Sequence, residues 1–216
     1  MKYKHDLTKG AALLAVFVLW TFLIITVDVE PVGPKGASVG FATLNGWFHQ
    51  MTGVHMGLYT MTDWLGLIPV AVCMAFGGIG LSQLVRRRSL AKVDADILLL
   101  GVYYVIVIGG YLLFEMIPIN YRPVLIEGRM EVSYPSSTTL LVLSVMPTLV
   151  FQAQQRLQGI AMKKGVCILT MAFSVFMVMG RLLAGVHWFT DIIGGILLSA
   201  GLFYMYKAGV LFLQKK

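Results

Sequence analysis

The sequence predicts an all-α membrane protein, a six-transmembrane helical bundle with an outer interfacial helical segment. Hydrophobic residues make up 58% of its 216 residues and charged residues 12%, and the mean hydropathy is +0.81. A typical soluble domain carries about twice that share of charged residues. Six charge-poor stretches have lengths that suit membrane-spanning helices. Neither an internal repeat nor a second domain is apparent, so we expect residues 1–216 to form one six-span domain.

The expected spans are six stretches of the sequence, namely residues 11–27, 64–85, 97–114, 132–155, 165–180 and 192–206. The last two are short for a bilayer, and we expect both to extend toward the segment that joins them. The first follows a basic segment, as a signal sequence does, but lacks a small-residue cleavage site, so we interpret it as a retained anchor. Residues 39–56 are apolar with scattered polar groups, which predicts the interfacial helix.

The lysines and arginines are divided unequally between the two ends of the expected bundle. Four fall on one side, Lys35, Arg122, Arg129 and Arg181, and the remaining 13 on the other, Lys2, Lys4, Lys9, Arg86, Arg87, Arg88, Lys92, Arg156, Lys163, Lys164, Lys207, Lys215 and Lys216. Cytoplasmic loops carry such an excess. We therefore expect a multi-pass protein of the plasma (cytoplasmic) membrane with both termini cytoplasmic, and we interpret the net charge of +7 as a topology signal and not as nucleic-acid binding.

Residues 180–191 place three ionisable side chains, Arg181, His187 and Asp191, at the outer ends of two apolar spans. If one helix contains both His187 and Asp191, their four-residue spacing lets the carboxylate hold the imidazole, as for an oriented nucleophile or base. Each residue also has a simpler interpretation, as a snorkelling arginine, an interfacial histidine and a helix cap. Together they favour a functional site, because ionisable groups near membrane depth are usually functional.

The outer loop 115–139 offers a second group of candidate residues. Arg122 carries a planar fork of donors that suits a phosphate or a carboxylate. Ser136, Ser137 and Thr138 follow a proline at an expected helix start, where free backbone N–H groups favour an anion. With Arg181 arriving from the neighbouring span, these groups predict a pocket for a phosphate group. No carboxylate cluster has metal-ligand spacing, so we expect no metal and no other cofactor.

The order and spacing of these residues resemble three motifs of the membrane branch of the type 2 phosphatidic acid phosphatase superfamily, which is related to the vanadium haloperoxidases. The motifs read Lys, six residues, Arg-Pro; Pro-Ser-Gly-His; and Ser-Arg, five residues, His, three residues, Asp. Arg122 matches the arginine of the first motif, residues 135–138 match the second and residues 180–191 contain the third. The resemblance implies a six-span lipid phosphatase-like domain.

The resemblance also implies a role for each matching residue. His187 would attack phosphorus and form a phosphohistidine intermediate, and Asp191 would orient it. Arg122, Arg181 and Ser136 would bind the phosphoryl oxygens. These roles suit phosphoryl transfer, which requires in-line placement and a cationic clamp on the oxygens.

Three positions depart from the motifs. Glu115 stands at the lysine of the first motif, Thr138 at the histidine of the second and Gly180 at the serine of the third. In the family that histidine protonates the leaving oxygen, a contribution of ~10²–10⁴ in rate for general acids, and a threonine hydroxyl is too weak an acid to replace it. A phosphate that leaves from a diphosphate is already a stable anion. We therefore expect a preference for diphosphate esters or other substrates with a good leaving group.

Several residues are left as candidates for the vacant acid position. Glu115 would serve if it were protonated, or would be neutralised by pairing with Arg122 or Arg129. His49 and His55 lie on the same side, although for both we favour an interpretation as interfacial polar residues.

Two functions from different classes remain. The first is a membrane lipid phosphatase or diphosphatase acting on the extracytoplasmic face, with a substrate of the polyprenyl diphosphate, phosphatidic acid or phosphatidylglycerophosphate type, or a phosphotransferase. The second is a catalytically silent relative that binds lipid phosphates or acts in a membrane complex. The retained His187 and Asp191 favour the enzyme, because a silent protein has no chemical need of them. The expected partners are the lipid substrate and membrane lipids, with no nucleic acid.

Overall fold

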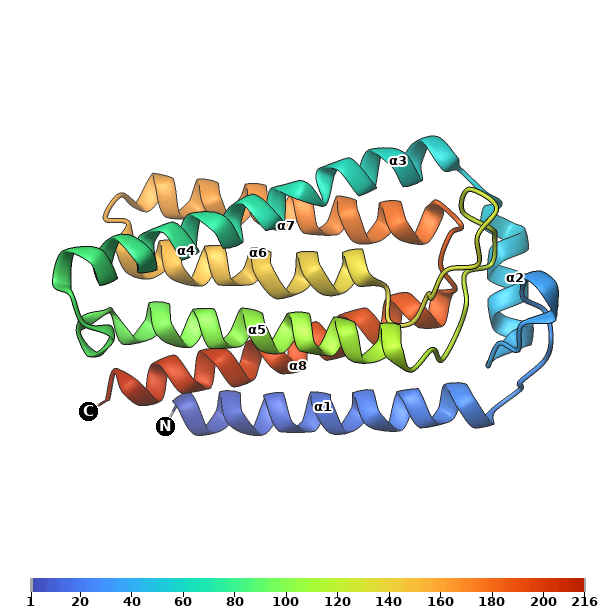
Figure 1. Ribbon diagram of the computed structural model, residues 1–216, viewed down its shortest axis with the longest axis horizontal. Coiled ribbons are helices and arrows are strands. Elements are labelled where there is room, and N and C mark those ends of the chain that lie inside the picture. The colour runs from blue at the N-terminus through green and yellow to red at the C-terminus, as the bar shows by residue number, and fades with distance from the viewer. Residues whose placement is uncertain (1, 216) are drawn as a thin grey trace.

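The computed structural model describes residues 2–215, in which helices connected by loops form one elongated bundle (Figure 1). Met1 and Lys216 lie outside the described residues, and Lys216 is one of the cations that we assigned to the cytoplasmic side. The helices are α1 (Lys2–Thr26), α2 (Ala42–Thr52), α3 (Met56–Leu65), α4 (Leu67–Arg87), α5 (Ala95–Met116), α6 (Ser137–Arg156), α7 (Ile160–Leu183) and α8 (Phe189–Leu213), with short 3₁₀ turns at Pro34–Gly36 and Leu90–Lys92.

Six segments within residues 2–215 are long and apolar enough to cross a membrane, which confirms the predicted all-α, six-span fold. The second span is longer than expected, because α3 and α4 follow one another and together cover Met56–Arg87. The predicted boundary at residue 64 was therefore wrong. The fourth span begins at Ser137 and not at residue 132, since the segment before it is an extended loop ending in Pro135. The last two spans lengthen as expected, to Leu183 and back to Phe189.

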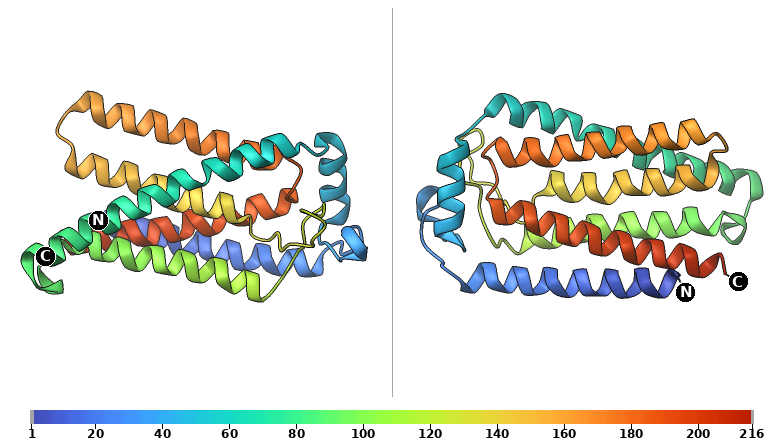
Figure 2. Two further views of the ribbon diagram at one scale, coloured as in Figure 1. Left: turned by 45° about the horizontal axis from the view of Figure 1, so that its top comes forward. Right: turned by 180° about the vertical axis from the view of Figure 1, so that it is seen from behind.

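The interfacial segment is α2, which lies across one end of the bundle instead of along it (Figures 1 and 2). Its large apolar side chains Leu44, Trp47 and Met51 are exposed. A short helix that presents such residues at the end of a membrane bundle suits a position at the membrane surface. This end of the molecule also carries the loop before α6 and the connection between α7 and α8 (Figure 1).

The core of the bundle forms around α6 and α8. α8 packs along α1 and also contacts α5 and α6, and its buried residues include Leu198, Tyr206 and Val210. The outward faces of α4, α5 and α7 expose large apolar side chains such as Leu81, Val105 and Leu169. This distribution is the one expected for helices whose outer faces contact lipid.

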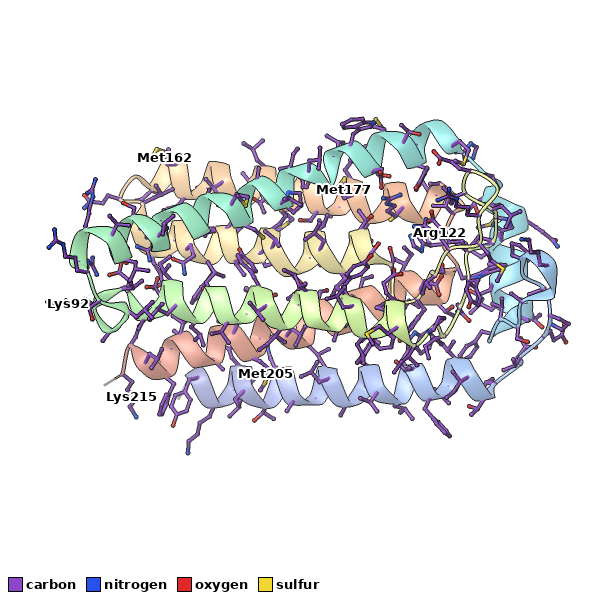
Figure 3. All side chains as sticks on the ribbon, in the orientation of Figure 1. Lys92, Arg122, Met162, Met177, Met205 and Lys215 are labelled. Carbon is purple, nitrogen blue, oxygen red and sulfur yellow. The ribbon has the colours of Figure 1, made fainter. Side chains whose placement is uncertain are left out.

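The two ends of the bundle differ in their charges. Lys92 marks the end that holds both termini and the α4–α5 and α6–α7 connections, whereas Arg122 lies at the opposite end near α2 (Figure 3). The structure thus gathers the predicted site segments at the end that is poor in cations, where the few cations present need a separate explanation.

Candidate active site

His187 lies in the short connection between α7 and α8, and Asp191 is the third residue of α8. The two residues do not share one helix, which was the condition for a common helix face, because the helix begins at Phe189 and Trp188 before it is extended. The closest contact between the two side chains joins His187 Nδ1 and Asp191 Oδ2 at 4.0 Å. Their spacing therefore brings them together across a helix N-terminus and not along a helix.

Ser133 lies between the imidazole and the carboxylate. Its Oγ is 3.0 Å from His187 Nδ1, and it donates a short hydrogen bond to Asp191 Oδ2. A hydroxyl has one proton to donate, and the carboxylate takes it, so Ser133 Oγ accepts from the Nδ1–H of the ring. The backbone carbonyl oxygen of Ser133, which can only accept, lies 3.2 Å from the same Nδ1. This pattern selects the tautomer whose lone pair is on Nε2, the atom that a nucleophilic imidazole uses.

Asp191 is fully buried, and its carboxylate accepts hydrogen bonds from three donors. Asn120 Nδ2 donates to Oδ1 at 3.0 Å, and the Trp188 backbone N–H donates to Oδ2 at 2.9 Å, beside the bond from Ser133. Asp191 thus caps α8 and also supports His187 through Ser133. The structure is therefore compatible with both interpretations of Asp191, as a helix cap and as the carboxylate that holds the imidazole.

The backbone around His187 is held by a close approach of two loops. Gly185 has a φ of +68°, and a Cβ at this position would lie 1.9 Å from the carbonyl oxygen of Gly53. His55 N–H donates to Ala184 O at 3.0 Å in the same place. The connection that carries His187 is therefore fixed against the segment between α2 and α3.

Arg122 and Arg181 are both buried at this end of the bundle, with 8% and 1% of their surface exposed. Their guanidinium carbons lie 5.7 Å and 4.9 Å from the centre of the same Tyr59 ring. Each arginine has one acidic partner: Arg122 Nε lies 3.0 Å from Glu131 Oε2, and Arg181 Nη2 lies 2.7 Å from Asp63 Oδ1. The structure thus brings the two predicted phosphate-binding cations together.

The two guanidiniums also act on His187. Burial lowers the pKa of this imidazole well below its usual value of 6.5, and the positive charges of Arg122 and Arg181 lower it further. The ring is therefore neutral at physiological pH, which is the form that can act as a nucleophile.

Ser136 is the N-cap residue of α6, and its backbone N–H donates to Asp191 O at 3.1 Å. Its hydroxyl, although buried, makes no capping hydrogen bond. Ser137 is half-buried and Thr138 is buried in the first turn of the same helix. The start of α6 is therefore joined to the backbone of Asp191, and its free backbone N–H groups are available to an anion.

Several buried polar atoms of these residues have no hydrogen-bond partner in the described chain. They are Ser136 Oγ, Arg122 Nε and Nη1, Arg181 Nε and Nη1, and His187 Nε2; Arg122 Nε has only its ion-pair contact with Glu131. Leaving such a group unpaired typically costs about 1–3 kcal/mol. A cluster of unpaired donors around two guanidiniums suits an anion with several oxygens, such as a phosphoryl group.

Other predicted candidates lie apart from this cluster. Glu115 is exposed near the end of α5, and Arg122 pairs with Glu131 instead of Glu115. The centre of the His49 ring lies 5.7 Å from that of Trp188, with the two ring planes tilted by 60°, and burial lowers the pKa of His49. His55 is exposed, with Nε2 2.9 Å from Thr52 O.

Four residues of the site were missed by the sequence analysis, namely Asn120, Ser133, Tyr59 and Asp63. Asn120 and Ser133 come from the same loop as Arg122, and a hydroxyl or amide close to a recognised motif was the available signal. Tyr59 and Asp63 come from α3, and nothing in their sequence neighbourhood connects them with Arg181, which lies 118 residues after Asp63.

A cavity of about 310 Å³ adjoins the site between α4, α5 and α6. Its walls are mostly apolar, with Leu67, Ile108 and Leu141 among the lining residues, and its polar end carries Asp63, Tyr111, Ser137 and Thr138. Leu67 and Ile108 are also exposed on the outer surface of the bundle. The cavity therefore joins the apolar flank of the bundle to the first turn of α6.

The chain has the fold of a known membrane phosphatase. It resembles the crystal structure of a transmembrane PAP2-type phosphatidylglycerolphosphate phosphatase from Bacillus subtilis with a TM-score of 0.68, at 18% sequence identity and with 96% of each chain covered. No curated protein sequence gives a significant match. The family description "PAP2 superfamily" matches residues 97–214, which include all three motifs and α5 to α8. This match extends over more than half of the chain, which therefore belongs to the PAP2 superfamily.

Proposed function

We propose that this protein is a membrane lipid phosphatase or diphosphatase that works through a phosphohistidine intermediate on the extracytoplasmic face. The observation that carries the proposal is the cluster of buried, unpartnered donors on Arg122, Arg181 and Ser136 around the free Nε2 of His187. A phosphoryl group would supply acceptors for all of these donors. The membership of the PAP2 superfamily supports the same chemistry.

In the proposed reaction the phosphoryl oxygens bind to the two guanidiniums and to Ser136 Oγ. His187 Nε2 attacks phosphorus opposite the leaving oxygen, and the bond to that oxygen breaks with its electron pair. The ring then gains positive charge, which the carboxylate of Asp191 stabilises through Ser133. Such preorganised charges stabilise the transition state without further reorganisation.

The apolar cavity beside the site supports a lipid substrate. Its apolar lining can receive a hydrocarbon chain from the bilayer, while its polar end at Ser137 and Thr138 adjoins the phosphate site. A single prenyl or acyl chain fits such a cavity better than a water-soluble head group does. Charge bias alone supports the extracytoplasmic position of the site.

Thr138 supports a preference for a good leaving group. It lines the polar end of the cavity, where the family motif has its acid, and it offers only a hydroxyl. A diphosphate ester releases a phosphate monoester anion that needs no proton. We therefore propose that a polyprenyl diphosphate is hydrolysed faster than phosphatidic acid, and equal or faster turnover of phosphatidic acid would contradict this preference.

The test is phosphate release by the purified protein from phosphatidic acid, phosphatidylglycerophosphate and a polyprenyl diphosphate. We expect release from at least the diphosphate, with its loss in His187→Ala. His5→Ala is the matched control, because this histidine is exposed near the opposite end of the bundle. Release that survives in His187→Ala would refute the nucleophile. No release from any of the three lipids by the wild type would favour a relative that only binds lipid phosphates.

A further inference from the structure

α3 contributes two side chains to the phosphate site, one helical turn apart. The Tyr59 ring lies against both guanidiniums, and Asp63 Oδ1 lies 2.7 Å from Arg181 Nη2. Both residues precede the part of the chain that matches the superfamily, residues 97–214. They are therefore features of the site that the three motifs do not contain.

The close packing of α3 on α7 depends on Gly180. A Cβ at this position would lie 2.7 Å from Thr62 Cγ2, so the serine of the family motif would require the Thr62 side chain or α3 to shift. Thr62 and Gly180 directly precede Asp63 and Arg181 in the sequence. The glycine that replaces the serine of the motif therefore lies directly beside the pair formed by Asp63 and Arg181.

Asp63 lies between the buried phosphate site and the solvent-exposed surface. The side chain of Arg181 is 2% exposed, whereas that of Asp63 is 62% exposed. Asp63 lines the same cavity as Thr138, the position of the missing acid. Its carboxylate therefore contacts a phosphate-binding cation on one side and has access to water on the other.

On the basis of the proposed phosphohistidine intermediate, we propose that Asp63 is the catalytic base of the second half-reaction. A water molecule in the cavity attacks phosphorus, and its oxygen forms the new P–O bond. The P–Nε2 bond breaks and its electron pair returns to the imidazole of His187. The proton of the water passes to the carboxylate of Asp63, which releases it to solvent.

The position of Asp63 suits the attack of water on the intermediate. In-line displacement requires the water to approach opposite Nε2, along the path by which the lipid product departs. The cavity that leads to Thr138 is the proposed path, and Asp63 lies on its wall. Arg181 would hold the phosphoryl oxygens and the carboxylate side by side, which places the water between base and phosphorus.

The contact with Arg181 also explains why Asp63 acts in the second step and not in the first. A carboxylate paired with a guanidinium accepts hydrogen bonds and has no proton to give. It can therefore receive a proton from water but cannot protonate a leaving oxygen. A diphosphate substrate needs no general acid in the first step, so the only proton transfer that the reaction requires is the one from water to Asp63 in the second step.

The test uses Asp63→Asn, which keeps an oxygen for Arg181 and removes the proton acceptor. The purified variant is mixed with a polyprenyl diphosphate labelled in its terminal phosphate, and lipid product, protein-bound label and free phosphate are followed separately. We expect a rapid burst of about one lipid product per protein and accumulation of acid-labile, protein-bound label. Release of free phosphate falls by roughly 10²–10⁴-fold, the usual contribution of a general base.

Two outcomes would overturn the assignment. If the burst is lost together with phosphate release, Asp63 only positions Arg181, and if release is unchanged, it has no part in the reaction. Glu30→Gln is the control, because Glu30 is an exposed acid at the same end of the molecule. If Asp63→Asn does not fold, Asp63→Ala with added formate replaces it: formate restores release if a base is missing, and failure to restore it counts against the proposal.

The failure of this inference is distinguishable from that of the proposed function. Wild type and His187→Ala are measured side by side with the Asp63 variants. Label that binds to His187→Ala, or phosphate release by it, contradicts the nucleophile. If phosphate release by the wild type requires His187 but the Asp63→Asn variant accumulates no protein-bound label, only the assignment of Asp63 as the base is contradicted.

Discussion

Ser133 Oγ lies 3.0 Å from His187 Nδ1 and hydrogen-bonds at the same time to Asp191 Oδ2. The carboxylate itself stays 4.0 Å from the ring nitrogen. The histidine is therefore oriented through a hydroxyl, with the buried carboxylate behind it. In this arrangement Ser133 is a positioning residue: it fixes the tautomer and the direction of Nε2 without contact with the phosphoryl group.

Replacement of Ser133 by alanine removes the donor to Asp191 and one of the two acceptors near the Nδ1–H, and it leaves the backbone carbonyl oxygen of residue 133 at 3.2 Å from Nδ1. We expect kcat to fall by roughly 10- to 100-fold, in the range found for residues that orient a ligating or reacting histidine, while KM changes little. Steady-state kinetics of phosphate release measure both parameters. Ser133→Thr keeps the hydroxyl and should recover most of kcat. An equal loss in the threonine and alanine variants would indicate a packing effect instead.

The outline of the site was predictable because its principal residues stand in short, ordered motifs near the ends of apolar spans. Arg122, Arg181 and His187 were identified from their charge in an apolar context. Ser133 was not, because hydroxyls are common in loops and its role depends on a contact with residues more than 50 positions later. Asp63 was missed for the same reason, since its partner lies in a distant helix.

The low pKa of His187 predicts a specific pH dependence. Because the proposed nucleophile is the neutral ring, kcat/KM should show an acid limb for this group far below pH 6.5, the usual value for histidine. Arg122→Gln removes one of the positive charges that lower the pKa, so the acid limb should move to higher pH. The profile is compared with that of Arg129→Gln, an exposed arginine of the same loop. Use of one substrate throughout cancels the substrate's own ionisation.

An acid limb for His187 at or above pH 6.5 in the wild type would contradict this prediction. So would an equal displacement in both arginine variants, because Arg129 is not among the charges that act on the His187 ring.

Gly185→Ala tests the loop contact that holds His187 in place. The left-handed backbone at φ +68° costs a residue with a Cβ about 1–2 kcal/mol, and the new Cβ would also collide with Gly53 O at 1.9 Å. We expect a lower unfolding temperature in detergent and a loss of activity. Gly101→Ala in α5 is the control, because nothing lies within 4 Å of the Cβ at this position and alanine is the better helix former. Similar unfolding temperatures for the two variants would contradict the expectation.

The break between α7 and α8 was predictable in part. The two spans were expected to extend toward one another, and a single helix containing both His187 and Asp191 was only a condition; Gly185, with a left-handed φ of +68°, lies between the two helices. Asp191 was considered as a helix cap, and it stands at the third helical position, where an acidic side chain often caps the backbone before the helix. The lengths of the hydrophobic stretches predicted the number of spans, whereas the residues at which the helices begin and end depended on local turns and caps.

The expected orientation in the membrane can be tested with cysteines at the two ends of the bundle. Arg129 lies in the loop before α6 at the site end, and Ala91 lies in the connection between α4 and α5 at the other end; both are exposed. Cys73 and Cys167 are half-buried free thiols, and replacing both by alanine provides the background. We expect a membrane-impermeant maleimide to label Arg129→Cys on intact cells, and Ala91→Cys only after lysis. The physical reason is the retention of lysine- and arginine-rich loops on the cytoplasmic side. The opposite labelling pattern would place the phosphate site in the cytoplasm and contradict the proposed extracytoplasmic reaction.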